Sequence, residues 1–367
     1  MKATTTARSR IRKPAQAPPG TAPGTACATA VSGRRARPAR TAVRAAGLLA
    51  ALAVLAAVAL LSLAVGARPL SPAQAWDGLV DSASESYTVV HRMRLPRTLL
   101  GLLAGAALGL AGAVMQSLTR NPLAEPGILG INAGASAAVV SAISFLGIGS
   151  ITGYVWFAFA GAGAVAVLLY AVGGGRTATP ARLALAGAAL NAALYSYVNA
   201  VQLLDTASLD RMRFWTVGSL AAAQPGTVRG IAPFVIAGTL LALALARPLN
   251  ALAMGEETAR ALGAGPARTR IAAVAAVTLL CGAATAACGP IIFVGLMVPH
   301  LVRALTGPDL RWVLPYSAVL APALMLAADV IGRVAARPSE IQVGVLTVVL
   351  GGPVFLWFVR GRKVAAS

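Results

Sequence analysis

The sequence predicts an all-α integral membrane protein with ten transmembrane helices and both termini in the cytoplasm. The 367 residues are 57% hydrophobic and 11% charged, and the mean hydropathy is +0.76, a composition typical of chains that cross a membrane repeatedly. Uncharged runs of spanning length recur along the chain, and basic residues are distributed unevenly between the segments that separate them. Because lipid offers no hydrogen-bond partners to the backbone, a helical bundle is the simplest architecture for such a chain.

The first 44 residues, 1–44, differ from the rest and predict a disordered, basic cytoplasmic tail. This tract holds ten of the 31 basic residues among Pro, Ala, Thr and Gly, with few large apolar side chains. It lacks the apolar core of a cleavable signal peptide, so the first apolar run is expected to remain as an anchor. Its charge suits contact with anionic lipid headgroups, and no nucleic-acid site is indicated. Residues 45–367 are expected to form the transmembrane domain.

The apolar runs after the tail divide into ten spans. Gly127 to Gly175 carries no charge and is long enough for two helices that turn at Gly147 to Gly153. Ile271 to Pro299 is too long for one upright helix, and Gly289-Pro290 divides it into a full helix and a short half-helix ending near Pro299-His300. The expected spans are residues 45–67, 98–119, two within 127–175, 183–204, 230–246, two within 271–299, 312–328 and 341–359.

The basic residues set the predicted orientation. With ten spans, both termini lie on one side; if that side is the cytoplasm, inner segments hold 22 basic and 4 acidic residues, and outer segments hold 9 basic and 7 acidic residues. Lys and Arg concentrate on the cytoplasmic side, so both ends are expected inside. In the outer segments, Ser71-Pro72 is expected to cap a short helix through Leu79, and residues 205–228 to form an interfacial excursion anchored by Trp215.

Arg247 to Arg270 is a charged inner segment between two uncharged runs. Pro248 can open one short helix and Gly255 can end it, which places Glu256-Glu257 in the first turn of a second helix that Gly263 would end. A helix this short is marginal in water by itself. We therefore interpret the segment as a docking element for another protein, with an ordinary charged loop as the alternative.

Several functional classes lack their sequence signatures. No GxxxxGK[ST] motif occurs, so the chain has no P-loop for ATP. The two histidines, His91 and His300, fall on opposite faces of the predicted topology and support no serine–histidine–acid set, so an enzyme is not expected. Cys27, Cys281 and Cys288 lack zinc-ligand spacing, and the last two are expected to lie buried in one helix.

The stretch Arg94 to Gly134 combines small residues with polar ones. Gly and Ala permit close helix approach, whereas Gln116, Glu125 and Asn132 must face a bundle interior or an aqueous path at membrane depth. Asn121 to Pro126 (NPLAEP) breaks the helix twice, which suits the lining or gating of a pathway. A packing kink with an interhelical hydrogen bond is the alternative.

A set of short motifs runs in order from Arg94 to Arg360. They are RLPR at Arg94–Arg97, GAVMQ and NPLAEPGILG within Gly112–Gly130, GEETARALG at Gly255–Gly263, GPIIFVGLMVPHLVR at Gly289–Arg303, Gly307-Pro-Asp309, Ala328-Asp329 with Arg333, Glu340 with Gly344, and GGPVF at Gly351–Phe355. As a set they resemble the FecCD or vitamin B12-permease family, the permease subunits of importers for iron–siderophore, heme and vitamin B12.

The resemblance implies the type II permease fold of an ATP-binding cassette (ABC) importer. Such an importer combines two permease subunits, two cytoplasmic ATPase subunits that bind the ATP and Mg²⁺, and an external substrate-binding protein or lipoprotein. The permease itself would bind no cofactor and no metal. It would be a multi-pass protein of the cytoplasmic (inner) membrane, forming a homodimer or pairing with a second, paralogous permease.

The matched residues imply three functional groups. Coupling to the ATPase is implied for Gly255, Glu256, Glu257, Ala259, Arg260, Leu262 and Gly263; docking of the binding protein for Arg94, Arg97 and Arg333; and lining or gating of the pathway for Gln116, Asn121, Leu123, Thr179 and Pro180. The docking pairs are expected to be exposed and worth about 0–1 kcal/mol each, with headgroup phosphates as the alternative partners of the arginines. Asp329 is expected to pair with Arg333, one helical turn on.

The implied cargo is a ferric siderophore. Gln342 stands where many relatives have proline, and it resembles the variant of siderophore permeases. Ala321 stands where many relatives have glycine. Heme or vitamin B12, moved by the same mechanism, is the alternative cargo. An ion-coupled secondary transporter is an alternative of another class, but it needs ionisable groups at mid-membrane and the spans offer almost none.

Overall fold

The computed structural model describes residues 37–66, 70–148, 150–173 and 180–364. The chain separates into two units, Met1–Thr41 and Ala42–Ser367. Of the first unit, Arg37–Thr41 are described and form the start of the first helix. Residues 1–36, most of the expected tail and Cys27 with it, lie outside the described residues.

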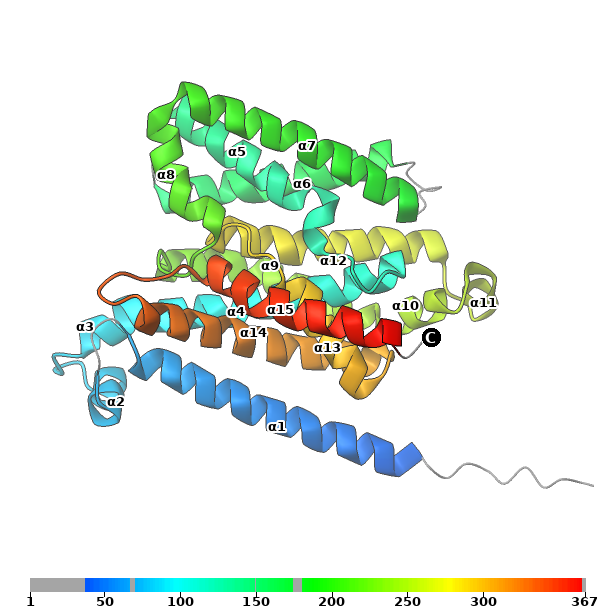
Figure 1. Cartoon of the computed structure of the whole chain (residues 1–367), viewed down its shortest axis with the longest axis horizontal. Helices are drawn as coiled ribbons and strands as arrows, with labels where there is room; N and C mark the ends of the chain where they lie inside the picture. Colours follow the sequence, from blue (N-terminus) through cyan, green and yellow to red (C-terminus); the bar gives the residue numbers. More distant parts are fainter. Residues whose placement is uncertain (1–36, 67–69, 149, 174–179, 365–367) are drawn as a thin grey trace, which may run out of the picture. The chain divides into compact units, whose positions relative to one another are not determined.

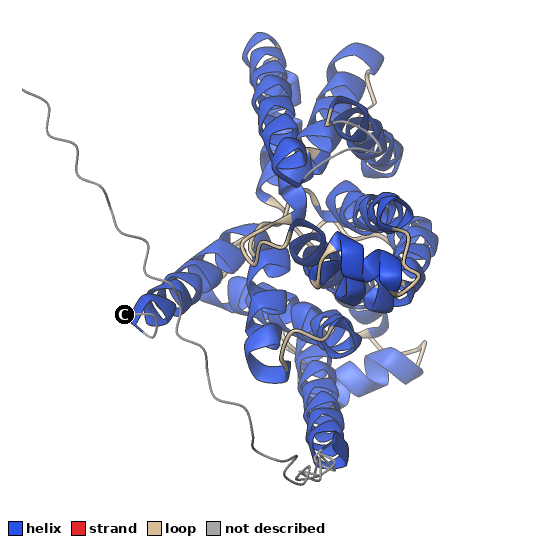
Figure 2. Cartoon of the chain, turned by 90° about the vertical axis from the view of Figure 1, so that its right-hand side faces the viewer, coloured by secondary structure: helices blue, strands red, loops and turns tan. Residues whose placement is uncertain are grey.

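Helices make up almost all of the described chain, and no strand occurs within it (Figure 2). In chain order they are α1 (Arg37–Ala64), α2 (Pro72–Val80), α3 (Tyr87–Val89), the π-helix η1 (Val90–Arg94), α4 (Leu95–Thr119), the 3₁₀-helix η2 (Pro126–Leu129), α5 (Ile131–Leu146), α6 (Ile151–Val172), α7 (Pro180–Leu204), α8 (Thr206–Val217), α9 (Pro225–Ala244), α10 (Ala246–Ala253), α11 (Glu256–Ala261), α12 (Pro266–Cys288), α13 (Val294–Thr306), α14 (Leu310–Ala335) and α15 (Val343–Val364).

Seven of the described helices are long and apolar enough to cross a membrane. These are α1 from Thr41, the run Tyr87–Thr119 that ends in α4, α6, α7, α9, α12 and α14. Three shorter apolar helices, α5, α13 and the first half of α15, occupy the positions of the other predicted spans. The prediction of an all-helical membrane protein is confirmed, and the count of ten crossings stays a prediction.

Two helix boundaries differ from the sequence-based expectation. α1 begins at Arg37, inside the segment expected to be disordered, because the sequence there is rich in Arg and Ala, which are strong helix formers. The expected half-helix ending near Pro299 is wrong: α13 starts at Val294 and continues through Pro299 to Thr306. Pro299 lacks an N–H, but the helix tolerates it because Gln116 Nε2 on α4 donates to the freed carbonyl of Gly295 at 3.4 Å.

The segments expected outside the membrane also form helices. Ser71 caps α2 in a reciprocal capping box with Gln74. Asp205 Oδ1 accepts the Ala207 N–H at 3.1 Å and caps α8. The expectation that Trp215 is an interfacial anchor is wrong. Trp215 is only 8% exposed, and its backbone carbonyl packs against Gly289, at the break between α12 and α13.

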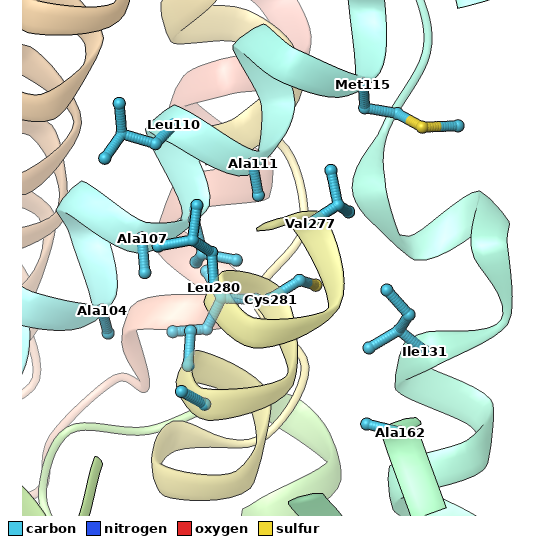
Figure 3. Packing of buried hydrophobic residues seen from close by; sticks show 14 of the residues in the cluster. Ala104, Ala107, Leu110, Ala111, Met115, Ile131, Ala162, Val277, Leu280 and Cys281 are labelled. Carbon is cyan, nitrogen blue, oxygen red and sulfur yellow. The ribbon is translucent and has the colours of Figure 1, made fainter. Parts of the chain in front are cut away.

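α4 lies in the core of the second unit. In its most apolar window, 78% of the residues are buried, and small side chains let α12, α13 and α14 approach it closely. Figure 3 shows Ala107 and Ala111 of α4 beside Leu280 and Val277 of α12. Cys281 is buried in the same helix, as the sequence predicts for it and Cys288.

Replacing Gly112 by alanine should push α4 away from α13. A Cβ at this position would lie 1.8 Å from the carbonyl oxygen of Gly295, so the two backbones must separate, at a cost of about 1–3 kcal/mol. We expect Gly112→Ala to lower the Tm of the purified permease. Gly163→Ala in α6 is the matched control, since a Cβ there meets nothing within 4 Å; equal melting of the two variants would contradict the close contact.

The helices place two sets of candidate residues at opposite ends of the second unit (Figure 1). α2 and α3 lie at one end, together with the start of α4 and the end of α14. α10, α11 and the last turns of α15 lie at the other. These are the ends that the predicted topology assigns to the outside and the cytoplasm.

Candidate functional site

The segment Arg247–Arg270 forms the two short helices α10 and α11 (Figure 1). Leu249 and Leu252 are buried and fix α10 to the bundle. Gly255 then turns the chain at a φ of 120°, and Glu256-Glu257 occupy the first turn of α11, as the sequence predicts. A helix of six residues has little stability by itself, so its side-chain contacts must hold it in place.

Glu256 and Ala259 hold α11 against the chain. The Glu256 carboxylate accepts a hydrogen bond from Arg270 at the start of α12 and pairs with Arg260 at 3.5 Å. Ala259 is fully buried, and its carbonyl accepts the Ala264 N–H at 2.9 Å. Because Ala259 has no exposed surface, it helps to hold α11 against the rest of the chain.

The remaining predicted coupling residues face outward. Glu257, Arg260 and Gly263 are exposed, and Leu262 is 62% exposed at the end of α11. Met254, just before α11, is equally exposed. An apolar side chain that is mostly exposed at the end of a short, charged helix suits a hydrophobic pocket on another protein.

The three predicted docking arginines lie together at the opposite end, but they are not exposed. Arg94 and Arg333 are 5% and 3% exposed, and the Arg97 side chain is 12% exposed. The expectation of solvent-exposed arginines is therefore wrong. The end of α1 supplies the reason, because its last carbonyls have no intrahelical partners and must be satisfied by other donors.

Arg94 and Arg333 cap the C-terminal end of α1. Arg94 Nη1 donates to the carbonyls of Leu63 and Ala64, each at 2.6 Å. Arg333 Nη1 donates to the carbonyls of Ser62 at 3.0 Å and Val65 at 2.9 Å. Cations at a helix C-terminus also interact favourably with the helix dipole. These two arginines therefore join α1 to α14 and to η1, which leads directly into α4.

Asp329 bridges two of the arginines. Its Oδ1 receives Arg97 Nη2 at 2.8 Å, and its Oδ2 receives Arg333 Nη2 at 2.9 Å. The predicted Asp329–Arg333 pair is confirmed. Arg97 also donates through Nε to Asp329. Its third nitrogen, Nη1, donates to Glu340 at 2.7 Å. Glu340 is 30% exposed, so it covers the part of Arg97 that points away from the buried carboxylate.

The predicted pathway residue Gln116 lies buried between α4 and α13. Its Nε2 donates to the carbonyl of Leu296 at 2.9 Å, and its Oε1 accepts from Arg303. Arg303 Nη2 also donates to the Ala113 carbonyl at 3.1 Å and to Ser117 Oγ at 2.9 Å. In this conformation Gln116 serves helix packing, which is the alternative that the sequence left open for polar groups in this stretch.

Asn121 and Leu123 form an exposed turn after α4. Asn121 Oδ1 accepts the Leu123 N–H at 3.0 Å, and the Leu123 side chain is 45% exposed. Pro122 and Pro126 interrupt the helix as predicted, and η2 follows. Thr179 lies outside the described residues, as does the side chain of Pro180, the first residue of α7.

One polar surface escaped the sequence interpretation. In α7, Tyr195 and Asn199 are exposed on one face, although this helix is long and apolar enough to span a membrane. Tyr197 points elsewhere, and its hydroxyl lies 2.7 Å from Ser141 Oγ of α5. Only 17% of its most apolar window is buried. The signal was present in the sequence as a run of hydroxyl and amide side chains inside an uncharged span. Such groups are costly against lipid and must face protein or water.

Among the described residues, no group of three or more His, Cys, Asp or Glu side chains could hold a metal ion. His300 is 7% exposed and lies edge-on to Phe355, with ring centroids 6.4 Å apart. Cys281 and Cys288 are likewise buried inside α12.

Comparisons with known proteins agree on one family. The model of the FecCD transport family matches residues 54–361. The ferric enterobactin transport system permease protein of Escherichia coli (strain K12) is 47% identical over 308 residues, covering 82% of this chain and 91% of that protein. The Fe(3+)-citrate import system permease protein YfmD of Bacillus subtilis (strain 168) is 40% identical over 311 residues, covering 83% and 91%.

The hemin transport system permease protein of Yersinia pestis is 36% identical over 314 residues, covering 84% of this chain and 93% of that protein. Among solved structures, a metal-chelate type ABC transporter in an inward-facing conformation matches with a TM-score of 0.77 and 28% identity, covering 86% of this chain and 99% of that one. The family match and the identity to its members lead to one conclusion: the chain belongs to the FecCD transport family.

Proposed function

We propose that this chain is the permease subunit of an ABC importer that moves a ferric siderophore across the cytoplasmic membrane. The observation that carries the proposal is α11, a six-residue helix that is held from behind by Glu256 and Ala259 and presents Leu262 outward. The sequence has no P-loop. The force for transport therefore comes from a separate ATPase subunit, which binds the ATP and Mg²⁺ and receives α11 in a surface groove.

The proposed topology has ten spans and both termini in the cytoplasm. It assigns α10 and α11 to the cytoplasmic side and the cluster of Arg94, Arg97 and Arg333 to the outside, which fits their positions at opposite ends (Figure 1). In this topology the basic residues concentrate in the inner segments. Residues 45–367 then form one transmembrane domain that follows a basic N-terminal tail.

The polar surface of α7 supports a dimer with a path between its subunits. Exposed Tyr195 and Asn199, one helical turn apart on the same face of α7, would face lipid in an isolated subunit, and that arrangement is costly. A second permease subunit, identical or paralogous, covers this face, and the polar side chains line the aqueous path. The turn at Asn121 and Leu123 gates the path near its cytoplasmic end, because it breaks the helix and leaves both side chains exposed.

The cluster around Arg97 is the proposed contact for an external substrate-binding protein. Arg94 and Arg333 shape this surface from beneath by fixing α1, α4 and α14 together. Arg97 is the member that a partner can reach, through the Nη1 that Glu340 covers. A carboxylate on the binding protein would therefore compete with Glu340 for this nitrogen.

Glu340→Gln should strengthen docking of the binding protein. The amide removes the competing charge from Arg97, and the charged pair with the partner is then formed without displacing Glu340. We expect the Kd to fall by about three- to tenfold, in line with about 1 kcal/mol for a partly exposed pair. Surface plasmon resonance on nanodisc-embedded permease measures it. Arg97→Gln should remove the gain in a double-mutant cycle; a gain that persists without Arg97 would contradict the competition.

The cargo assignment rests on relatives and on one residue. The ferric enterobactin permease of E. coli is 47% identical over 82% of the chain, and Gln342 resembles the variant found in siderophore permeases. The hemin permease of Y. pestis is more distant, at 36% identity. Heme or vitamin B12 remains the second candidate cargo, and the same transport assay distinguishes them.

Reconstitution tests the proposed function. Proteoliposomes that contain the permease, its ATPase and an internal ATP supply should accumulate ferric enterobactin delivered by the binding protein. A catalytically dead ATPase should abolish uptake, and hemin or cobalamin should not be taken up. Uptake that continues with the dead ATPase and collapses with an uncoupler would identify an ion-coupled secondary transporter instead.

A further inference from the structure

A cavity of about 250 Å³ lies behind α10, between the ends of α4 and α13 and the start of α14. Its polar wall consists of Gln116, Ser117, Arg120, Asn250 and Arg303. Leu249, Ala253, Pro122, Pro308 and Leu310 complete it. Liquid water occupies about 30 Å³ per molecule, so the cavity has room for a polyatomic group together with several waters.

The charge of this cavity is uncompensated. None of its lining residues is acidic, and neither Arg120 nor Arg303 pairs with a carboxylate of the described chain. Arg303 donates to neutral acceptors on α4, namely Gln116, Ser117 and the Ala113 carbonyl. Arg120 Nη2 donates to the Leu252 carbonyl of α10 at 2.5 Å. Arg303 is partly buried, and a partly buried cation without a counter-ion is costly. Arg120 is exposed and adds a second positive charge to the lining. Together they favour an anion in the cavity.

Asp309, between the lining residues Pro308 and Leu310 in sequence, is bonded to other donors. Asp309 caps α14 and receives Asn250 Nδ2 at 2.7 Å and Arg311 Nε at 3.2 Å. Burial raises the pKa of Asp309, but the hydrogen bonds from Arg311 and Asn250 outweigh it, so the pKa lies below its ordinary value. Asp309 is thus ionised and bonded to other donors. Asn250, which lines the cavity and donates to Asp309, is neutral.

We propose that this cavity binds a phosphate group, held by Arg120 and Arg303. Guanidinium groups bind phosphate through paired, charge-assisted hydrogen bonds, and the Ser117 hydroxyl and the Asn250 amide add neutral partners. The cavity lies at the ends of membrane helices, where basic pockets between helices receive phospholipid headgroups. The phosphate is either that of an anionic lipid or a free cytoplasmic anion. Bound there, it joins α10, which leads into α11, to α4 and α13.

Thermal melting of the full-length permease in detergent tests the site and its source. One arm adds dioctanoyl phosphatidylglycerol against dioctanoyl phosphatidylcholine; the other adds sodium phosphate against sodium chloride at equal ionic strength. A specific ligand raises the Tm of the folded state. A shift with phosphatidylglycerol alone assigns a lipid headgroup, and a shift with inorganic phosphate assigns a free anion. No shift in either arm overturns the proposal.

Three variants separate the site from general charge effects. Arg120→Gln should weaken the apparent affinity about tenfold or more, the effect expected for one charge-assisted contact, and Arg120→Lys should retain most of it. Arg247→Gln removes a positive charge from exposed Arg247 on α10, outside the cavity, and should leave the shift intact. An equal loss in Arg247→Gln, or no loss in Arg120→Gln, overturns the proposal.

Ser117→Asp provides an independent measurement. It places a carboxylate beside Arg303, whose Nη2 lies 2.9 Å from Ser117 Oγ, and so supplies the missing counter-ion from within the chain. We expect a higher Tm without added anion and no further rise when anion is added. A variant that still responds like the wild type shows that Arg303 does not hold the anion. The melting experiment does not depend on transport, so its failure leaves the proposed function untouched.

Discussion

Leu262→Asp should uncouple the permease from its ATPase. Leu262 is 62% exposed at the end of α11, and Ala259 and Glu256 fix the helix that carries it. A carboxylate cannot enter an apolar groove without losing its hydration. Removal of a central apolar contact costs about 2 kcal/mol or more, so the ATPase should bind at least roughly 30-fold more weakly. Co-purification and ATP-dependent uptake should both fall to background.

Leu262→Met is the matched control for this experiment. It keeps the apolar character at the same exposed position, so the ATPase should still co-purify and transport should continue. Glu257→Gln changes a charge on an exposed part of the same helix, and it should have a smaller effect than Leu262→Asp. Retained co-purification of Leu262→Asp would contradict the assignment of α11 as the coupling element.

The helices and their order could be predicted from the sequence because local patterns determine them. Uncharged runs, the Gly289-Pro290 break and the Glu256-Glu257 turn each act within a few residues, and the structure has a helix or a break at each. The length of α13 could not be predicted in this way. It continues through Pro299 because Gln116, distant in sequence, satisfies the carbonyl that the proline leaves free.

The surroundings of the arginines could not be predicted for the same reason. From the sequence, Arg94 and Arg333 are positive charges in outer segments, where exposure is the ordinary expectation. Their burial depends on where α1 ends, because the unpaired carbonyls between Ser62 and Val65 become their acceptors. A helix end creates such acceptors, but only the packing of α1 against α4 and α14 decides which donors reach them.

Asp329→Asn should produce the largest loss of stability among substitutions at the outer end. Asp329 is 1% exposed and is the carboxylate that Arg97 and Arg333 share. The amide has nearly the same shape, but it leaves two guanidinium groups beside each other with no buried counter-ion. Breaking a buried pair from one side costs about 3–5 kcal/mol. We expect a marked drop in the Tm of the purified permease and weaker docking of the binding protein.

Comparison with Glu340→Gln distinguishes a buried counter-ion from a general effect of lost negative charge. Both substitutions remove one charge from Arg97, but Glu340 is 30% exposed and water can replace its contact. Glu340→Gln should therefore leave the Tm nearly unchanged, while Asp329→Asn lowers it strongly. In Asp329→Asn, adding Arg97→Leu should restore part of the stability, because it removes one of the two cations that Asp329 neutralises and leaves the contacts of Arg333 with α1 in place. Equal Tm values for the two single variants would show that Asp329 is not the shared partner that holds α4 and α14 together.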